Sequence, residues 1–189
     1  MINYHKIIDT FYSDNDKLRD ILVTHSTNVA EMAMEIIRRH PELCADSDFT
    51  YAAAMLHDIG IIECNAPGIE CYGKHEYICH GTLGATMLRA NCATWGIGEN
   101  EIEPYARVCE RHTGTGLTYT QIIERELPLL PKDYIPETIE EQIICYADKF
   151  FSKSRPQQMK TVDGVIHSLR KFGEDGINVF GRWHEKFGI

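Results

Sequence analysis

Apolar residues recur at steps of three and four positions along most of the 189-residue chain, which is the period of an amphipathic α-helix. The first such stripe extends from Leu18 to Ile36 and stops at Pro41, with Ser13 as the expected N-cap. Similar stripes occupy the windows 47–60, 81–91, 102–112, 118–123, 138–151 and 162–187, and the window 138–151 opens with the spacing of a capping box. The chain is therefore expected to be all-α.

Length and composition narrow the classes of protein to which the chain can belong. A chain of this length fits one domain with a real hydrophobic core, and no low-complexity tract or linker divides it. The formal net charge of -9 argues against a general nucleic-acid binder, which needs clustered Lys and Arg. No apolar run approaches the ~18 residues of a membrane span, and the first residues lack a signal-peptide pattern. We therefore expect a cytoplasmic protein with no nucleic-acid or membrane partner.

Two segments bounded by turn-forming residues follow the first helix. A second helix is expected to begin at Ser47 or Asp48 and to end at Gly60, where glycine can adopt the left-handed conformation of a helix C-terminus. The residues from Glu63 to His80 are interrupted by proline and glycine and are expected to form a long loop. Loops of that length often cover a functional site.

Histidines and aspartates occupy the apolar faces of the expected helices. His25, His112 and Asp148 lie on apolar stripes, and the adjacent pair His57-Asp58 falls in the last turn of the second helix. Burying an imidazole or a carboxylate without a partner costs about 2–7 kcal/mol, so these residues need partners. A hydrogen-bonded core residue is the simpler interpretation of any single one of them, whereas metal coordination explains the whole set.

This set of donor side chains predicts one or two divalent ions. A first metal site would comprise His25, His57, Asp58 and Asp148, with positions left for water. Asp58 is the natural bridge, because its second oxygen, together with His80 and His112, would hold another ion about 3.5 to 4 Å away. Imidazole suits iron, zinc and nickel, and carboxylates suit harder ions. We expect two divalent ions, with iron favoured and manganese, zinc, nickel or cobalt as alternatives.

In their order along the chain these residues resemble the HD-domain metal-dependent phosphohydrolase superfamily. The pattern of that superfamily, a histidine, a His-Asp doublet and a distant aspartate, matches His25, His57-Asp58 and Asp148, and residues 57–60 read His-Asp-Ile-Gly, the signature of the HDIG subgroup. The resemblance covers about 20–151 and implies an all-helical fold with a divalent metal held by those four residues. We expect a single HD-domain helical bundle over 1–189, with a metal-binding core at about 13–151 and C-terminal packing helices at 156–189.

Some members of the superfamily carry two further histidines between the doublet and the final aspartate and bind a second metal, commonly iron; His80 and His112 resemble that pair. The stretch from Arg111 to Lys149 also looks like a small group of uncharacterised bacterial and archaeal HDIG proteins. The chain lacks the lysine that follows the doublet motif in cyclic-dinucleotide phosphodiesterases, and it lacks the Glu-Asp pair of alarmone hydrolases. Neither of those two substrates is expected.

The hypothesis from sequence is a metal-dependent phosphohydrolase that cleaves a phosphate ester of a nucleotide or another small phosphorylated metabolite by metal-activated water. Asp58 would be the catalytic residue that orients the nucleophile, and Lys149, Arg111 and His75 are candidate contacts to this small anionic substrate. Two alternatives stay open: a mixed-valent di-iron oxygenase of the inositol oxygenase type, and a non-catalytic nucleotide-binding HD module. Nothing in the sequence indicates the oligomeric state.

Overall fold

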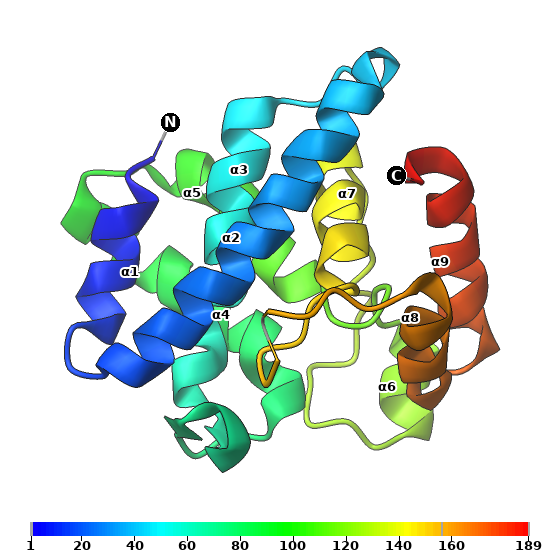
Figure 1. The fold of residues 1–189 in the computed structure, drawn as a ribbon. Coiled ribbons are helices and arrows are strands. Elements are labelled where there is room, and N and C mark those ends of the chain that lie inside the picture. The colour runs from blue at the N-terminus through cyan, green and yellow to red at the C-terminus, as the bar shows by residue number, and fades with distance from the viewer. Residues whose placement is uncertain (1, 156, 189) are drawn as a thin grey trace.

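Helices arranged around one large apolar core form the structure, a computed structural model that describes residues 2–155 and 157–188 (Figure 1). The α-helices are α1 (Tyr4–Tyr12), α2 (Asp16–Arg39), α3 (Ser47–Leu56), α4 (His80–Asn91), α5 (Glu99–Arg111), α6 (Tyr119–Glu124), α7 (Ile139–Asp148), α8 (Val162–Leu169) and α9 (Glu174–Phe187). Short 3₁₀ helices are η1 (Pro41–Leu43), η2 (Ile59–Glu63), η3 (Pro67–Ile69), η4 (Tyr77–Cys79), η5 (Cys92–Trp95) and η6 (Arg170–Phe172). The expected all-α class is confirmed. Positions 156 and 189, the expected bounds of the C-terminal helices, lie outside the described residues.

The long helix α2 forms the centre of the bundle and packs against α3 and α7. Its buried face carries Leu22, Val29 and Ile36 at helical spacing, and His25 lies on that same face. The N-cap lies two residues later than the expected Ser13. This N-cap is Asn15, whose side chain accepts a hydrogen bond from the backbone N–H of Leu18, while Ser13 is an exposed residue in the preceding turn.

Helix α1 precedes the first element expected from the sequence and buttresses the segment after the His-Asp doublet. Its buried residues include Ile7, Ile8 and Tyr12. The hydroxyl of Tyr12 donates a hydrogen bond to the carbonyl of Ile59 at 2.7 Å and accepts one from the N–H of Ile62 at 3.3 Å. Both contacts lie on η2, so α1 fixes the backbone directly after the doublet.

The end of α3 differs from expectation in a way that matters for the site. The helix stops at Leu56, and His57 and Asp58 lie in the turn between α3 and η2 rather than in the last helical turn. Gly60 has no left-handed backbone. Glycine is required at position 60 for another reason. A Cβ there would collide with the carbonyl oxygen of His80 and with the backbone nitrogen of Gly84 on α4. The turn and α4 therefore make backbone contact.

The segment between η2 and α4 is more ordered than a simple loop. Strand β1 (Asn65–Ala66) pairs with the antiparallel strand β2 (Cys71–Tyr72) in a small hairpin that contains η3, and η4 leads directly into α4.

The C-terminal helices pack beside α7, on the side of the molecule away from α1 (Figure 1). Helix α7 begins at the expected capping box, in which Thr138 and Glu141 exchange side-chain to backbone hydrogen bonds. Its Tyr146 ring contacts the rings of Phe180 and Phe187 on α9. Among the described residues, no helix combines the length and the apolar character needed to cross a bilayer.

Candidate metal centre

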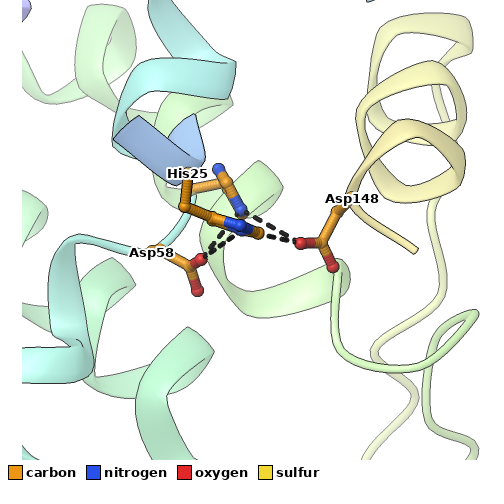
Figure 2. A group of neighbouring side chains, drawn as sticks. His25, Asp58 and Asp148 are labelled. Carbon is orange, nitrogen blue, oxygen red and sulfur yellow. Dashed lines mark hydrogen bonds and ion pairs between the residues drawn. The ribbon is translucent and has the colours of Figure 1, made fainter. Parts of the chain in front are cut away.

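Four of the six expected ligands meet at the centre of the bundle, from α2, the turn after α3, and the end of α7. His25 Nε2 lies 3.1 Å from Asp58 Oδ2 and 3.0 Å from Asp148 Oδ1. His57 Nε2 lies 3.0 and 3.5 Å from the same two oxygens. The two carboxylates approach the imidazole of His25 from opposite sides (Figure 2). Residues 123 positions apart in the sequence, His25 and Asp148, are thus in direct contact.

The other two expected ligands face the second oxygen of the shared carboxylate. His80, the first residue of α4, and His112, which follows α5, place their Nε2 atoms 3.4 and 3.3 Å from Asp58 Oδ1. Asp58 therefore lies between two groups of donors. The ligand atoms within each group lie within 4.8 Å of one another, and the two groups share only Asp58. This is the arrangement required of a carboxylate that bridges two ions.

Backbone carbonyls orient three of the four imidazoles. Nδ1 of His57 lies 2.6 Å from the carbonyl of Ala54, and Nδ1 of His80 and His112 make the same contact with the carbonyls three residues earlier, at 2.6 and 2.7 Å. A carbonyl oxygen only accepts, so Nδ1 carries the proton in each ring. In the neutral imidazole Nε2 then presents its lone pair to the centre, the orientation seen in histidines that ligate metals.

Unsatisfied polar atoms provide a test of whether cations fit. Nε2 of His57 and both carboxylate oxygens of Asp58 are buried and lack a hydrogen bond of regular geometry among the described residues. Oδ2 of Asp58 does form an ion pair with Lys153, whereas Oδ1 has only imidazole nitrogens beside it. Nε2 of His80 and Nε2 of His112 lie only 2.9 Å apart, although the Nδ1 contacts leave a lone pair on each. Two lone pairs at that separation repel unless a cation lies beside both. The donor set therefore fits divalent ions at both groups.

The pKa values of the central residues are strongly shifted by burial and by the neighbouring charges. Burial lowers the pKa of His57, but the negative charges of Asp58 and Asp148 outweigh burial and raise it to about 9. Burial and the neighbouring His112 lower the pKa of His80 to about 3. Burial raises the pKa of Asp58, and the positive charges of His57 and Lys153 more than reverse this, holding it well below its usual value. Two ionised carboxylates in a buried space favour binding of a cation.

Two lysines lie next to the aspartate ligands. Lys149 donates to Asp148 Oδ2 at 2.7 Å and to the carbonyl of His112 at 2.9 Å, so it connects a ligand of each group. Lys153 forms an ion pair with Asp58 Oδ2, and its ammonium lies 5.7 Å from the centre of the Tyr77 ring. Lys149 leaves Asp148 Oδ1 directed at His25 and His57, and thus orients that carboxylate toward the centre.

A cavity of about 620 Å³ opens onto the centre at His80, His112 and Asp148. Four lysines line it: Lys149, Lys153, Lys160 and Lys171. Among the described residues that line the cavity, Asp148 is the only carboxylate. The volume lies within the range of small-molecule sites, about 300–1,000 Å³. The lining of the cavity thus carries more positive than negative side chains, although the net charge of the protein is -9.

The three expected substrate contacts have different positions. Lys149 lines the cavity. Arg111 is directed elsewhere: its guanidinium pairs with Glu137 at 2.8 Å and Glu141 at 3.1 Å and ties α5 to α7. His75 is exposed in the segment before η4 and does not belong to the cavity lining. Of the three candidate substrate contacts, only Lys149 therefore lies beside the cavity.

The sequence reasoning missed Lys153, Lys160 and Lys171, and also Tyr12 behind the doublet. The lysines lie outside the expected core, on segments whose approach to the centre no local pattern reveals. One signal was available for Tyr12, because Ile8 and Tyr12 are four residues apart and continue a helical stripe from Tyr4.

The sequence profile of the HD domain matches residues 22–152 of this chain. A tRNA (cytidine(56)-2'-O)-methyltransferase of Thermoplasma volcanium is 29% identical over 167 residues, which are 88% of this chain and 41% of the relative. A protein of the same name from Picrophilus torridus is 33% identical over 141 residues, 75% of this chain and 34% of the relative. An uncharacterised protein of Methanocaldococcus jannaschii is 32% identical over 152 residues, 79% of this chain and 76% of the relative.

The chain thus spans less than half the length of the two methyltransferases to which it is similar. No solved structure matches it.

Proposed function

This chain belongs to the HD domain family, and we propose that it is a metal-dependent phosphohydrolase acting on a phosphate ester of a nucleotide or another small phosphorylated metabolite. The observation that carries the proposal is the position of the cavity. His80, His112 and Asp148 of the candidate metal centre line the same cavity as four lysines. A phosphate group bound there would meet both positive side chains and metal ligands.

Two divalent ions are proposed, with iron favoured by the four imidazoles. The first would be held by His25, His57, Asp58 and Asp148, and the second by Asp58, His80 and His112. When bound, such ions supply Lewis-acid stabilisation of phosphoryl oxygens and lower the pKa of water. The protein supplies the geometry: backbone carbonyls fix three imidazoles, and Lys149 fixes Asp148.

The residues of the chain have separable tasks in this proposal. Asp58 presents one oxygen to each group of donors and orients the attacking water between them. Lys153 is placed to neutralise negative charge on the phosphate, because its ammonium lies at Asp58 Oδ2 while its side chain lines the cavity. The ring of Tyr77 stacks on His80 at 4.7 Å and contributes an aromatic surface next to the reacting end.

The names of two relatives raise transfer of a methyl group to tRNA as a different activity. Because the chain spans only 41% and 34% of those proteins, we do not assign the activity in their names to it. The cavity has the volume of a small-molecule site, which favours a metabolite over a folded RNA. A short RNA nevertheless belongs in the experiment as one of its arms.

The test is a reconstitution followed by a substrate panel. Protein is purified anaerobically, loaded in parallel with ferrous iron or manganese, and incubated with nucleoside mono-, di- and triphosphates, sugar phosphates and a short RNA. We expect phosphate release from at least one small ester, lost after chelation and restored by metal. Oxygen consumption without phosphate release would instead support an oxygenase. Tight ligand binding with neither reaction would support a binding module, and either result would overturn the hydrolase proposal.

A further inference from the structure

The lysines of the cavity fall into two pairs. Lys149 and Lys153 each form an ion pair with an aspartate of the metal centre. Lys160 and Lys171 form no ion pair with any carboxylate of the described residues, although they line the same cavity. The first pair is thus partly neutralised by the protein, whereas the charge of the second pair is available to a ligand.

Lys160 is held in place by the backbone of the preceding turn. Its N–H donates to the carbonyl of Phe150 at 2.8 Å, and its ammonium donates to the carbonyl of Lys149 at 3.2 Å. The side chain is half-buried, and burial lowers the pKa of Lys160. The charge of Asp148 raises this pKa, while the charges of Lys149 and Lys171 lower it further, so that the net shift is downward. A partly desolvated ammonium among other ammonium groups is unfavourable unless an anion joins it.

Lys171 lies on η6, which is fixed from behind by α6. Arg125 donates to the carbonyl of Lys171 at 2.7 Å and to that of Phe172 at 2.8 Å, and Gln121 donates to the same Phe172 carbonyl at 3.2 Å. These bonds satisfy the backbone of η6 and set the position of the wall that Lys171 and Phe172 contribute to the cavity. The backbone of η6 is therefore fixed beside the cavity, and the exposed side chain of Lys171 extends from it into the lining.

From these contacts we propose that Lys160 and Lys171 form a subsite for a second phosphate group, and that the substrate is a small molecule with two separate phosphates. The inference rests on the proposed function, because the other phosphate is the one placed at the metal centre. The rings of Tyr77, Phe151 and Phe172 also line the cavity and provide contacts for an organic body that carries both groups. A nucleoside bisphosphate has this chemistry.

The test compares two ligands that differ by one phosphate: adenosine 5'-monophosphate and adenosine 3',5'-bisphosphate. Binding to metal-loaded protein is titrated calorimetrically at 4 °C, with product formation followed in parallel. The intact protein should bind the bisphosphate about 100-fold more tightly than the monophosphate, since each charge-assisted contact contributes about tenfold. Lys160→Gln and Lys171→Gln should each weaken bisphosphate binding about tenfold while leaving monophosphate binding and metal content unchanged.

Lys186→Gln is the matched control. Lys186 is an exposed lysine on α9 whose ammonium lies 5.2 Å from the centre of the Phe187 ring, much as that of Lys171 lies 5.0 Å from the ring of Phe172, but it is not part of the cavity lining. The Lys186→Gln substitution removes the same charge from the protein as Lys160→Gln or Lys171→Gln does. Its affinities for both ligands should match those of the intact protein.

Three results would overturn the subsite: equal binding of the two ligands, an unchanged preference in both lysine variants, or an equal loss in Lys186→Gln. Tighter binding of a short RNA through Lys160 and Lys171 would replace the small bisphosphate with a polynucleotide. A lysine-dependent preference for the bisphosphate without hydrolysis of any ester would leave the subsite standing and refute the hydrolase proposal. The two proposals can therefore fail separately.

Discussion

The metal centre and the lysine wall of the cavity are built in opposite ways. All six candidate ligands lie within residues 22–152, the part of the chain that matches the HD domain, and most are anchored through a backbone carbonyl or a neighbouring side chain. Lys153, Lys160 and Lys171 lie beyond that match, on the irregular segment after α7 and on η6. If the proposed function is correct, the family core supplies the metal ligands and the C-terminal segment supplies the positive charges that contact the substrate.

The two regions also differ in how strongly they constrain their side chains. Ligands in the centre are buried, and displacing one leaves a charge without a partner in a medium of low polarity. Of the cavity lysines, Lys160 is half-buried and Lys171 is exposed, so both remain partly hydrated on flexible stems, whereas Lys149 and Lys153 are nearly buried in ion pairs. Substitutions in the centre should therefore abolish metal binding, whereas substitutions in the wall should alter affinity in smaller steps.

The largest effect is expected from Asp58→Ala, because this substitution removes the ligand common to both groups. Metal content should fall close to zero, and hydrolysis should fall by about three orders of magnitude, well beyond the 10- to 100-fold loss typical of groups that only support a ligand. Elemental analysis and turnover of the same preparation measure both quantities. Asp20→Ala, an exposed aspartate on α2, is the control. Normal turnover with normal metal content in Asp58→Ala would refute the role of this carboxylate.

A smaller loss is expected from His80→Ala, which affects one group of ligands. Metal content should drop from two ions per chain to one, with activity reduced about 100-fold, because the first group keeps its four residues. His75→Ala, at an exposed position five residues earlier, should change neither quantity. If His80→Ala retains the metal content of the intact protein, the second ion does not bind where the structure indicates.

Lys149→Gln distinguishes a residue that positions a ligand from one that contacts substrate. Because Lys149 orients Asp148 and holds the carbonyl of His112, its loss should weaken metal binding about 10- to 100-fold. Lys171→Gln, which removes the same charge from the wall, should leave the metal dissociation constant unchanged. Competition with a chelator of known affinity measures both variants. Equal metal affinities in the two variants would show that Lys149 does not position a metal ligand.

The smallest effect is expected from Arg125→Gln, which loosens the support of η6 without removing a residue of the cavity lining. KM should rise about threefold with kcat and metal content unchanged, since only ground-state positioning is disturbed. Arg182→Gln, an exposed arginine on α9, serves as the reference. A change in kcat of similar size would show that η6 influences the metal centre as well.

Sequence patterns identified the candidate ligands that the structure brings together, because buried polar groups interrupt an apolar stripe. His25, His112 and Asp148 each stand on such a stripe, and the doublet stands at the end of another, so that burial and chemistry together predicted their convergence. Lysine carries no comparable signal, since an ordinary lysine is solvated wherever it occurs. The lysines at 160 and 171 reach the cavity only through tertiary packing, which periodicity does not describe.

Helix boundaries were predicted less well than the presence of helices. The capping box expected at the start of the window 138–151 is confirmed, because the hydroxyl of Thr138 accepts a hydrogen bond from the N–H of Glu141 within one turn. The end of α3 was placed too late, since the stripe continues through η2 while the hydrogen-bond pattern changes from α to 3₁₀. Periodicity does not resolve that change, because three- and four-residue steps suit both helices.

Gly60 has no side chain, and this allows the close approach that places His80 beside Asp58. With only a hydrogen at its α-carbon, Gly60 lets the backbone of η2 touch that of α4 at His80 and Gly84. Even the methyl group of an alanine would push α4 outward, and His80 would be carried away from Asp58 while His25, His57 and Asp148 stayed in place. The glycine of the His-Asp-Ile-Gly tetrapeptide thus keeps His80 beside Asp58, and the second group of candidate ligands depends on this contact.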